Sequence, residues 1–170
     1  MDALARNEQH KYEKIWEIPH YRGSSDYWLP SLFLDHFKTQ IYQGATLIDF
    51  GCGTGRSVPL LMQAGLQVNL LDIAENCLNP EIFLQTLGPN PPVHFFHECL
   101  WNLSPHIKPA DWIISFDVLE HIPESKIDIV LKEMASHMKI GGLFTIALCK
   151  DNFGSWIGEP LHLTVKPATW

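Results

Sequence analysis

Short apolar runs alternate with amphipathic stretches along most of this chain, which is the pattern of a parallel α/β sheet. The runs that we interpret as buried strands are 46–50, 67–71, 93–96, 111–117 and 143–148. Helical spacing follows at 56–64, at 79–87 and from Pro123 to a stop at Gly141-Gly142. Short links and right-handed crossovers then predict an α/β fold with a doubly wound parallel sheet in the strand order 3-2-1-4-5.

Two further amphipathic stretches precede the first strand. We predict one helix over residues 7–18, stopped by Pro19, and another over 27–42, ended by Gly44, with a polar loop at 20–26 between them. The chain of 170 residues is 46% hydrophobic, which is enough for one buried core. We therefore expect a single domain with three parts: cap helices at 1–45, an α/β core at 46–149 and a polar tail at 150–170.

The first strand runs directly into a turn with three glycines at alternate positions. Gly51, Gly53 and Gly55 permit positive φ and remove the Cβ atoms that would keep a ligand away from the backbone. Strand, glycine turn and helix N-terminus in this order are typical of a nucleotide-binding βαβ unit. We expect open backbone amides at the turn and a bound ligand beside them.

The residues around the turn favour a cationic nucleoside over a dinucleotide. The dinucleotide fingerprint needs glycine at position 56, where this chain has Arg56, and Asp49 would lie beside an anionic pyrophosphate. S-adenosylmethionine carries a sulfonium and an ammonium group but no phosphate. Asp72 ends the second strand about twenty residues after the turn, where a carboxylate accepts hydrogen bonds from both ribose hydroxyls. Alternatively, Asp72 caps the next helix through the amides of Glu75 and Asn76.

At two places the sequence resembles the class I S-adenosylmethionine-dependent methyltransferases. The stretch Asp49-Phe50-Gly51-Cys52-Gly53-Thr54-Gly55 resembles their motif I. The stretch 117–123, Asp-Val-Leu-Glu-His-Ile-Pro, resembles the segment after strand four in small-molecule enzymes of this family, including quinone-biosynthesis types. The resemblance implies a Rossmann-like fold, S-adenosyl-L-methionine as the cofactor and a small molecule as the methyl acceptor.

The resemblance also assigns roles to individual residues. It implies that Glu98 takes the adenine N6 hydrogens and that Leu100 or Trp101 packs on the ring. It also implies that Tyr12, Tyr21 and Arg22 in the cap reach the surroundings of the sulfonium and the methionine carboxylate. The complete set implied for the cofactor is Asp49, Gly51, Cys52, Gly53, Gly55, Asp72, Ile73, Glu98, Leu100, Phe116, Tyr21 and Arg22.

The candidate catalytic residues are His121 and Asp117. Imidazole has the pKa range to take a proton from a hydroxyl or a protonated amine, and Asp117 is the second choice. His121 has a structural alternative as well, because a histidine before proline at a helix start often only orients the loop. Aromatic residues of the cap, such as Tyr12 and Tyr21, fit a packing role as well as a ligand contact.

Composition narrows the partners and the setting. A net charge of −7 without any lysine or arginine run argues against nucleic acid and anionic membrane surfaces. No apolar run approaches the roughly 20 residues that span a bilayer, so we expect a cytoplasmic protein. The four cysteines are widely spaced, which predicts reduced thiols and no metal site; His94, His97 and Cys99 are interpreted as strand residues.

Two other functions stay open, as does the state of the fifth strand. The chain could bind S-adenosylmethionine without transferring a methyl group, or, with less support, could be an NAD-dependent oxidoreductase. No further strand pair is visible after residue 149, although the resembled family adds strands outside the fifth. The open edge of that strand would then be covered by the tail, by sequence beyond this chain, or by a second copy in a homodimer.

Overall fold

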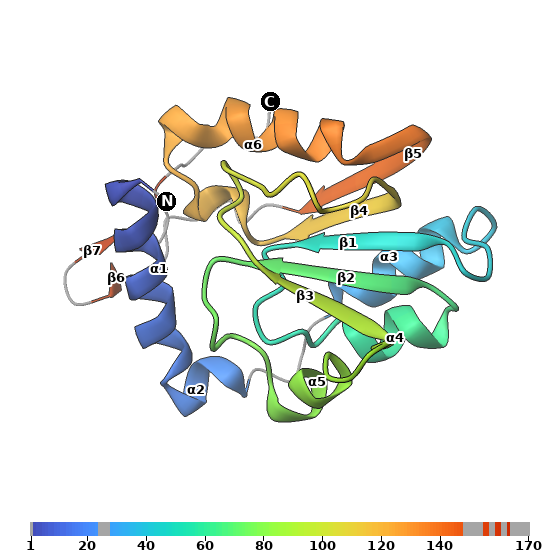
Figure 1. The fold of residues 1–170 in the computed structure, drawn as a ribbon, viewed down its shortest axis with the longest axis horizontal. Coiled ribbons are helices and arrows are strands. Elements are labelled where there is room, and N and C mark those ends of the chain that lie inside the picture. The colour runs from blue at the N-terminus through green and yellow to red at the C-terminus, as the bar shows by residue number, and fades with distance from the viewer. Residues whose placement is uncertain (1, 24–27, 148–154, 157–158, 161–162, 164–170) are drawn as a thin grey trace.

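The computed structural model of the chain describes residues 2–23, 28–147, 155–156, 159–160 and 163. Its centre is a parallel five-stranded sheet in the order β3-β2-β1-β4-β5 (Figure 1). The strands are β1 (Thr46–Phe50), β2 (Gln67–Asp72), β3 (Val93–His97), β4 (Ala110–Phe116) and β5 (Met138–Ala147). The predicted fold class and strand order are confirmed.

Successive side chains of each strand point to opposite faces of the sheet, and both faces carry apolar side chains. Helices cover both faces. Leu47 of β1 packs into one apolar cluster and Ile48 into the other. The first cluster includes residues of α3 (Leu29–Phe37), α4 (Val58–Gln63) and α5 (Pro80–Gln85). The second is covered by α6 (Glu124–Ser136), which Figure 1 shows on the opposite side of the sheet from α3 and α4.

The N-terminal segment forms two helices in place of one helix and a loop. The first helix, α1 (Ala3–Trp16), starts earlier than predicted because the Asp2 carboxylate accepts a hydrogen bond from the Ala5 amide at 2.8 Å. Pro19 ends the predicted helix but also starts α2 (Pro19–Arg22), because proline suits the first turn of a helix. The prediction of a loop at 20–26 is therefore wrong for 20–22, and residues 24–27 lie outside the described part.

The double glycine at 141–142 belongs to a strand and not to a helix end. Helix α6 stops at Ser136, where the His137 amide donates to the Glu133 carbonyl, and β5 begins at Met138. The register between β4 and β5 shifts between Ala110 and Trp112. A Cβ on Gly142 would come within 2.9 Å of the Asp111 carbonyl oxygen, so the close approach at this bulge requires glycine. The prediction that the glycines terminate the helix is wrong.

The C-terminal part contains a strand pair that the sequence pattern did not reveal. Strands β6 (Ser155–Trp156) and β7 (Glu159–Pro160) pair antiparallel in a separate sheet. Further on, the Leu163 amide donates to the carbonyl of Glu120 in the 3-10 helix η1 (Leu119–His121) at 2.7 Å. Among the described strands, β5 pairs with β4 alone. Leu163 thus lies against η1, and the described residues show no strand on the outer edge of β5.

A partly exposed polar cluster lies at the amino-terminal ends of three strands. One carboxylate oxygen of Asp111 accepts hydrogen bonds from the Thr46 amide at 2.8 Å, the Thr46 hydroxyl at 2.7 Å and the Lys139 ammonium at 2.8 Å. Burial acts to raise the pKa of Asp111, but the Lys139 and Thr46 hydrogen bonds outweigh it and hold the pKa well below its usual range. The cluster therefore links β1, β4 and β5 at the end opposite the glycine turn.

A helix that crosses a bilayer needs about 20 consecutive apolar residues. Among the residues that the structure places, no helix is long and apolar enough to cross a membrane.

Candidate cofactor site

A cavity of about 290 Å³ lies where β1, β2 and β4 end and α1 crosses them. Parallel α/β sheets bind their ligands at the carboxyl ends of the strands, in the crevice where the strand order reverses. Its walls are formed by Glu8, Tyr12, Ile15, Trp16, Tyr21, Asp49, Gly51, Cys52, Gly53, Thr54, Arg56, Ser57, Asp72, Ile73, Leu100, Trp101, Phe116, Asp117, Val118, His121 and Ile122.

The glycine turn has the conformation that its sequence predicts. Gly51, Gly53 and Gly55 have φ values of +79°, +51° and +72°. A Cβ on Gly51 would meet Val118 Cγ2 at 2.6 Å, so the turn packs tightly against the loop after β4. The expectation of open amides is wrong for part of the turn: the Gly51 and Cys52 amides both donate to the Leu71 carbonyl. Gly51 and Cys52 line the cavity, but their amides are already used within the fold.

Asp72 connects the second strand to the glycine turn. One carboxylate oxygen accepts a hydrogen bond from the Gly53 amide and the other from the Ala74 amide, each at 2.9 Å. Burial raises the pKa of Asp72, although these two amides act in the opposite direction. Each carboxylate oxygen has a second lone pair, so the backbone contacts fix the carboxylate and leave it able to accept ligand hydrogen bonds.

Asp49 is a second buried carboxylate at this edge. Its side chain accepts a hydrogen bond from the Ser57 hydroxyl at 2.6 Å, and the residue is 5% exposed. Burial raises the pKa of Asp49 to about 6, against the effect of the Ser57 hydrogen bond. Asp49 is therefore mostly charged at neutral pH, and Arg56, which also lines the cavity, offsets only part of the cost of burying that charge.

Helix α1 brings two buried donors to the cavity. The Tyr12 hydroxyl and the Trp16 indole nitrogen have no hydrogen-bond partner among the described residues, and both residues line the cavity. Burial, reinforced by Glu8 and Asp72, raises the pKa of Tyr12 well above its usual value, so the hydroxyl keeps its proton. Buried donors of this kind normally have partners, which marks this wall as a place for a ligand acceptor atom.

The loop after β4 carries the residues proposed for catalysis. Asp117 has a φ of +56°, and among the described residues it is the only non-glycine position with positive φ. Such strained positions gather at functional sites. The His121 ring contacts the Tyr12 ring edge to face, with centroids 5.8 Å apart. Phe116, Asp117 and His121 all line the cavity, so this loop faces α1 across the site.

Most of the residues predicted for the site lie on the cavity wall. From the cofactor set these are Asp49, Gly51, Cys52, Gly53, Asp72, Ile73, Leu100, Phe116 and Tyr21, together with the catalytic candidates Asp117 and His121. The sequence pattern did not single out Glu8, Trp16, Thr54, Val118 or Ile122, which share this wall. Spacing of three to four residues could have pointed to Glu8 and Trp16, because they share a helix face with Tyr12.

Three predicted cofactor residues are placed elsewhere. The Arg22 guanidinium donates to the carbonyls of Trp16, Cys77, Leu78 and Asn76, so it links the cap to the loop after β2 instead of facing the cavity. Glu98 does not line the cavity; its amide donates to the Asp72 carbonyl at 2.9 Å. Gly55 packs against Ile82, where a Cβ would be 2.8 Å from Cγ2. All three contact loops around the site, and none of them lines the cavity.

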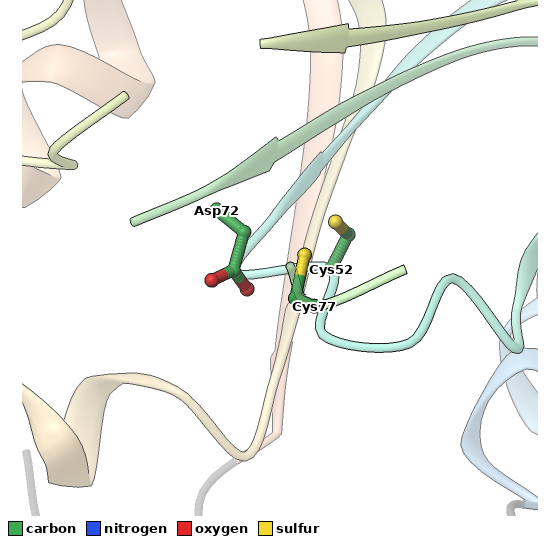
Figure 2. A group of neighbouring side chains, drawn as sticks. All are labelled: Cys52, Asp72 and Cys77. Carbon is green, nitrogen blue, oxygen red and sulfur yellow. The ribbon is translucent and has the colours of Figure 1, made fainter. Parts of the chain in front are cut away.

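Two thiols and a carboxylate form a cluster at the glycine turn. Figure 2 shows Cys52, Asp72 and Cys77 as neighbouring side chains, and their donor atoms lie within 4.8 Å of one another. The sequence predicted no metal site, because these residues are far apart in the chain. Of the strand residues His94, His97 and Cys99, His97 contacts the protein backbone: its Nε2 lies 2.8 Å from the Ile73 carbonyl oxygen.

Comparison with known proteins identifies the family. The family model of a methyltransferase domain matches residues 26–158. Trans-aconitate 2-methyltransferase of Azoarcus sp. (strain BH72) is 24% identical over 135 residues, which are 78% of this chain and 49% of that protein. The chain thus spans about half the length of this relative.

Solved structures share the fold at low sequence identity. The DhpI-SAM-HEP complex superposes with a TM-score of 0.66 at 17% identity, over 89% of this chain and 69% of that one. The 1,6-didemethyltoxoflavin-N1-methyltransferase of Burkholderia thailandensis, crystallised with 1,6-didemethyltoxoflavin and S-adenosylhomocysteine, gives 0.58 at 18% identity, over 84% and 60%. With the family model covering the whole α/β core, this chain belongs to the methyltransferase domain family.

Proposed function

We propose that this chain binds S-adenosylmethionine in the cavity and transfers the methyl group to a small-molecule acceptor. The observation that carries the proposal is the position of Asp72 at the end of β2, buried and fixed by the Gly53 and Ala74 amides. A carboxylate held in this way is preorganised to accept hydrogen bonds from two vicinal hydroxyls of a ribose.

The surroundings of Asp72 fit the rest of an adenosine. Ile73, Leu100 and Trp101 line the same cavity and supply apolar surface for a flat base. Glu98 is not part of the cavity wall, so we propose that adenine is held mainly by packing. Gly51, Cys52 and Gly53 line the neighbouring wall, where the turn packs against Val118 and the Trp16 ring.

Charge favours a cationic cofactor over a dinucleotide. The cavity wall carries Asp49 and Asp72 as buried carboxylates, and a pyrophosphate here would place like charges together. A sulfonium or ammonium group would instead offset the charge on Asp49, and the rings of Tyr12, Tyr21 and Phe116 could stabilise it further. The donors of Tyr12 and Trp16 would take the acceptor oxygens of the methionine part.

Little catalytic chemistry would be needed from the protein itself. The bound sulfonium supplies an electrophilic methyl group, so the chain has to position the acceptor in line with it. We propose that His121 takes the proton of a hydroxyl or amine acceptor, with Asp117 as the second candidate. The related sugar N-methyltransferase KedS8 from Streptoalloteichus sp. ATCC 53650 shares the fold, with a TM-score of 0.60 at 16% identity, which supports a small acceptor.

Calorimetry and a transfer assay test the two parts of the proposal separately. We expect S-adenosylmethionine and S-adenosylhomocysteine to bind the chain, and NAD not to bind. With a panel of small hydroxyl and amine acceptors, we expect labelled methyl groups to appear in product, and His121→Ala to lower the turnover rate without changing cofactor affinity. Binding of NAD alone would overturn the cofactor; cofactor binding without product from any acceptor would favour a binding module.

We further propose that a second copy of the chain covers the outer edge of β5. Ile140 and Leu143 on this strand are exposed, and two identical edges can pair antiparallel about a two-fold axis. Light scattering after size-exclusion chromatography should then give the mass of a dimer, and Ile140→Lys should shift it toward the monomer. A monodisperse monomer for the unaltered chain would rule this out.

A further inference from the structure

The cluster of Cys52, Asp72 and Cys77 contains two thiols to which the proposed cofactor site gives no role. Cys52 comes from the glycine turn, Asp72 from the end of β2 and Cys77 from the loop after β2. All three residues are buried, and Figure 2 shows their side chains next to one another. Since three segments converge there, the grouping is a product of the fold and not of sequence proximity.

The spacing of the donor atoms suits a small cation. Sulfur ligands lie about 2.3 Å from zinc, so two corners of a tetrahedral site are about 3.8 Å apart. The three donor atoms already lie within 4.8 Å of one another, and shifts below roughly 1 Å would therefore reach that geometry. Two thiolates with a carboxylate suit zinc and similar thiophilic cations better than magnesium or calcium.

The loop that carries Cys77 is held in place independently of any ligand. The Arg22 guanidinium donates to the carbonyl of Cys77 at 3.2 Å and to that of Leu78 at 3.0 Å. On the other side, the Asp72 carboxylate is fixed by the Gly53 and Ala74 amides. A ligand set whose supports are already in place loses little freedom when it binds a metal.

We propose that Cys52, Cys77 and Asp72 form a binding site for a thiophilic divalent cation such as Zn²⁺. Cys52 and Asp72 line the cavity, so water or a ligand atom in the cavity would supply the fourth ligand. On binding, each thiol releases its proton to solvent and both sulfurs coordinate as thiolates. Metal binding changes no oxidation state.

Zinc and S-adenosylmethionine would compete for Asp72, an expectation that rests on the proposed function. Asp72 cannot give both oxygens to a ribose while one of them coordinates a cation, so zinc should raise the apparent Kd of S-adenosylmethionine. Metal binding itself is measured without any cofactor. If metal binds but does not change the Kd of S-adenosylmethionine, the ribose role of Asp72 is contradicted. If no metal binds, the metal site is contradicted.

Cobalt is the probe for the test, because thiolate ligation of Co²⁺ gives charge-transfer bands and a tetrahedral site gives strong visible bands. We expect the reduced full chain to bind one Co²⁺ with these bands and to lose them on addition of Zn²⁺. Cys52→Ser and Cys77→Ser should each weaken binding at least about 10-fold, since even an indirect partner of a metal ligand contributes 10–100-fold. Cys99→Ser is the matched control, as Cys99 is also buried and free, and it should bind like the unaltered chain.

A measurement on the unaltered chain covers the case in which a serine variant does not fold. X-ray absorption of the zinc-loaded chain should show two sulfur ligands. The site would be overturned by a zinc ion without sulfur neighbours, by Cys52→Ser and Cys77→Ser variants that fold and bind cobalt as tightly as Cys99→Ser, or by two thiols that are found joined as a disulfide before metal is added.

Discussion

The two ends of the sheet use the same residue type in opposite ways. At the amino-terminal ends, Asp111 accepts hydrogen bonds from Thr46 and Lys139 and its pKa is lowered. At the carboxyl-terminal ends, burial raises the pKa values of Asp49 and Asp72. The first arrangement stabilises the fold, and the second keeps charge under-compensated. The contrast indicates that the carboxyl-terminal end is built for a ligand, because folding buries two carboxylates there and leaves the Tyr12 and Trp16 donors without partners among the described residues.

The sharpest test of this contrast removes the carboxylate of Asp72. We expect Asp72→Ala to weaken S-adenosylhomocysteine binding about 1000-fold, because two hydrogen bonds to a charged acceptor contribute roughly 1.5–3 kcal/mol each. Calorimetry measures the change in Kd. Asp111→Ala serves as the control at the other end and should leave Kd within about 2-fold; equal losses in both variants would remove the distinction between the two ends.

A glycine pair provides the next test, since both ends contain a glycine with nearly the same φ. Gly51→Ala should lower the free energy of unfolding by about 3–4 kcal/mol, from the left-handed backbone and the collision with Val118. Gly141 has a φ of +81° and no atom within 4 Å of the place that a Cβ would take, so its change to alanine should cost only about 1–2 kcal/mol. Denaturant unfolding measures both, and similar losses would mean that the packing of the turn is loose.

Asp49→Asn separates stability from function. Because the pKa of Asp49 is raised to about 6 in the folded chain, its charge opposes folding at neutral pH by about 2–3 kcal/mol. The variant should therefore be more stable than the unaltered chain at pH 7, and the advantage should shrink as the pH falls from about 6 to 4. Cofactor affinity should fall. A variant that is less stable at pH 7 would show that the Asp49 charge is compensated within the fold.

The smallest expected effect is that of Asp111→Asn. Its lowered pKa contributes stability above about pH 4 that is lost as the pH falls further, the opposite sign to Asp49. Lys139 is 45% exposed, so solvent screening limits the loss to about 1 kcal/mol at pH 7. Thermal unfolding at several pH values measures it. A pH dependence with the same sign as that of Asp49→Asn would contradict the comparison.

The sequence predicted the sheet because strand and helix periods are local and regular. It predicted Asp49, Asp72 and the glycine turn for the same reason: they occupy fixed places relative to strand ends. It did not predict the contacts of Arg22, because a long side chain in a cap can reach backbone carbonyls that no local pattern reveals. The grouping of Cys52 with Cys77 also depends on tertiary packing. The sequence also predicted a helix end at Gly142. The contact that requires glycine there is with the Asp111 carbonyl, which belongs to another strand and leaves no local pattern.

The most direct test of the account is a crystal structure of the chain with S-adenosylhomocysteine. We predict that both ribose hydroxyls lie within hydrogen-bond distance of the Asp72 carboxylate, with the base between Ile73 and Leu100 and the amino acid part under Tyr12 and Trp16. A nucleoside bound away from Asp72, or bound at the amino-terminal end of the sheet near Asp111, would contradict the account.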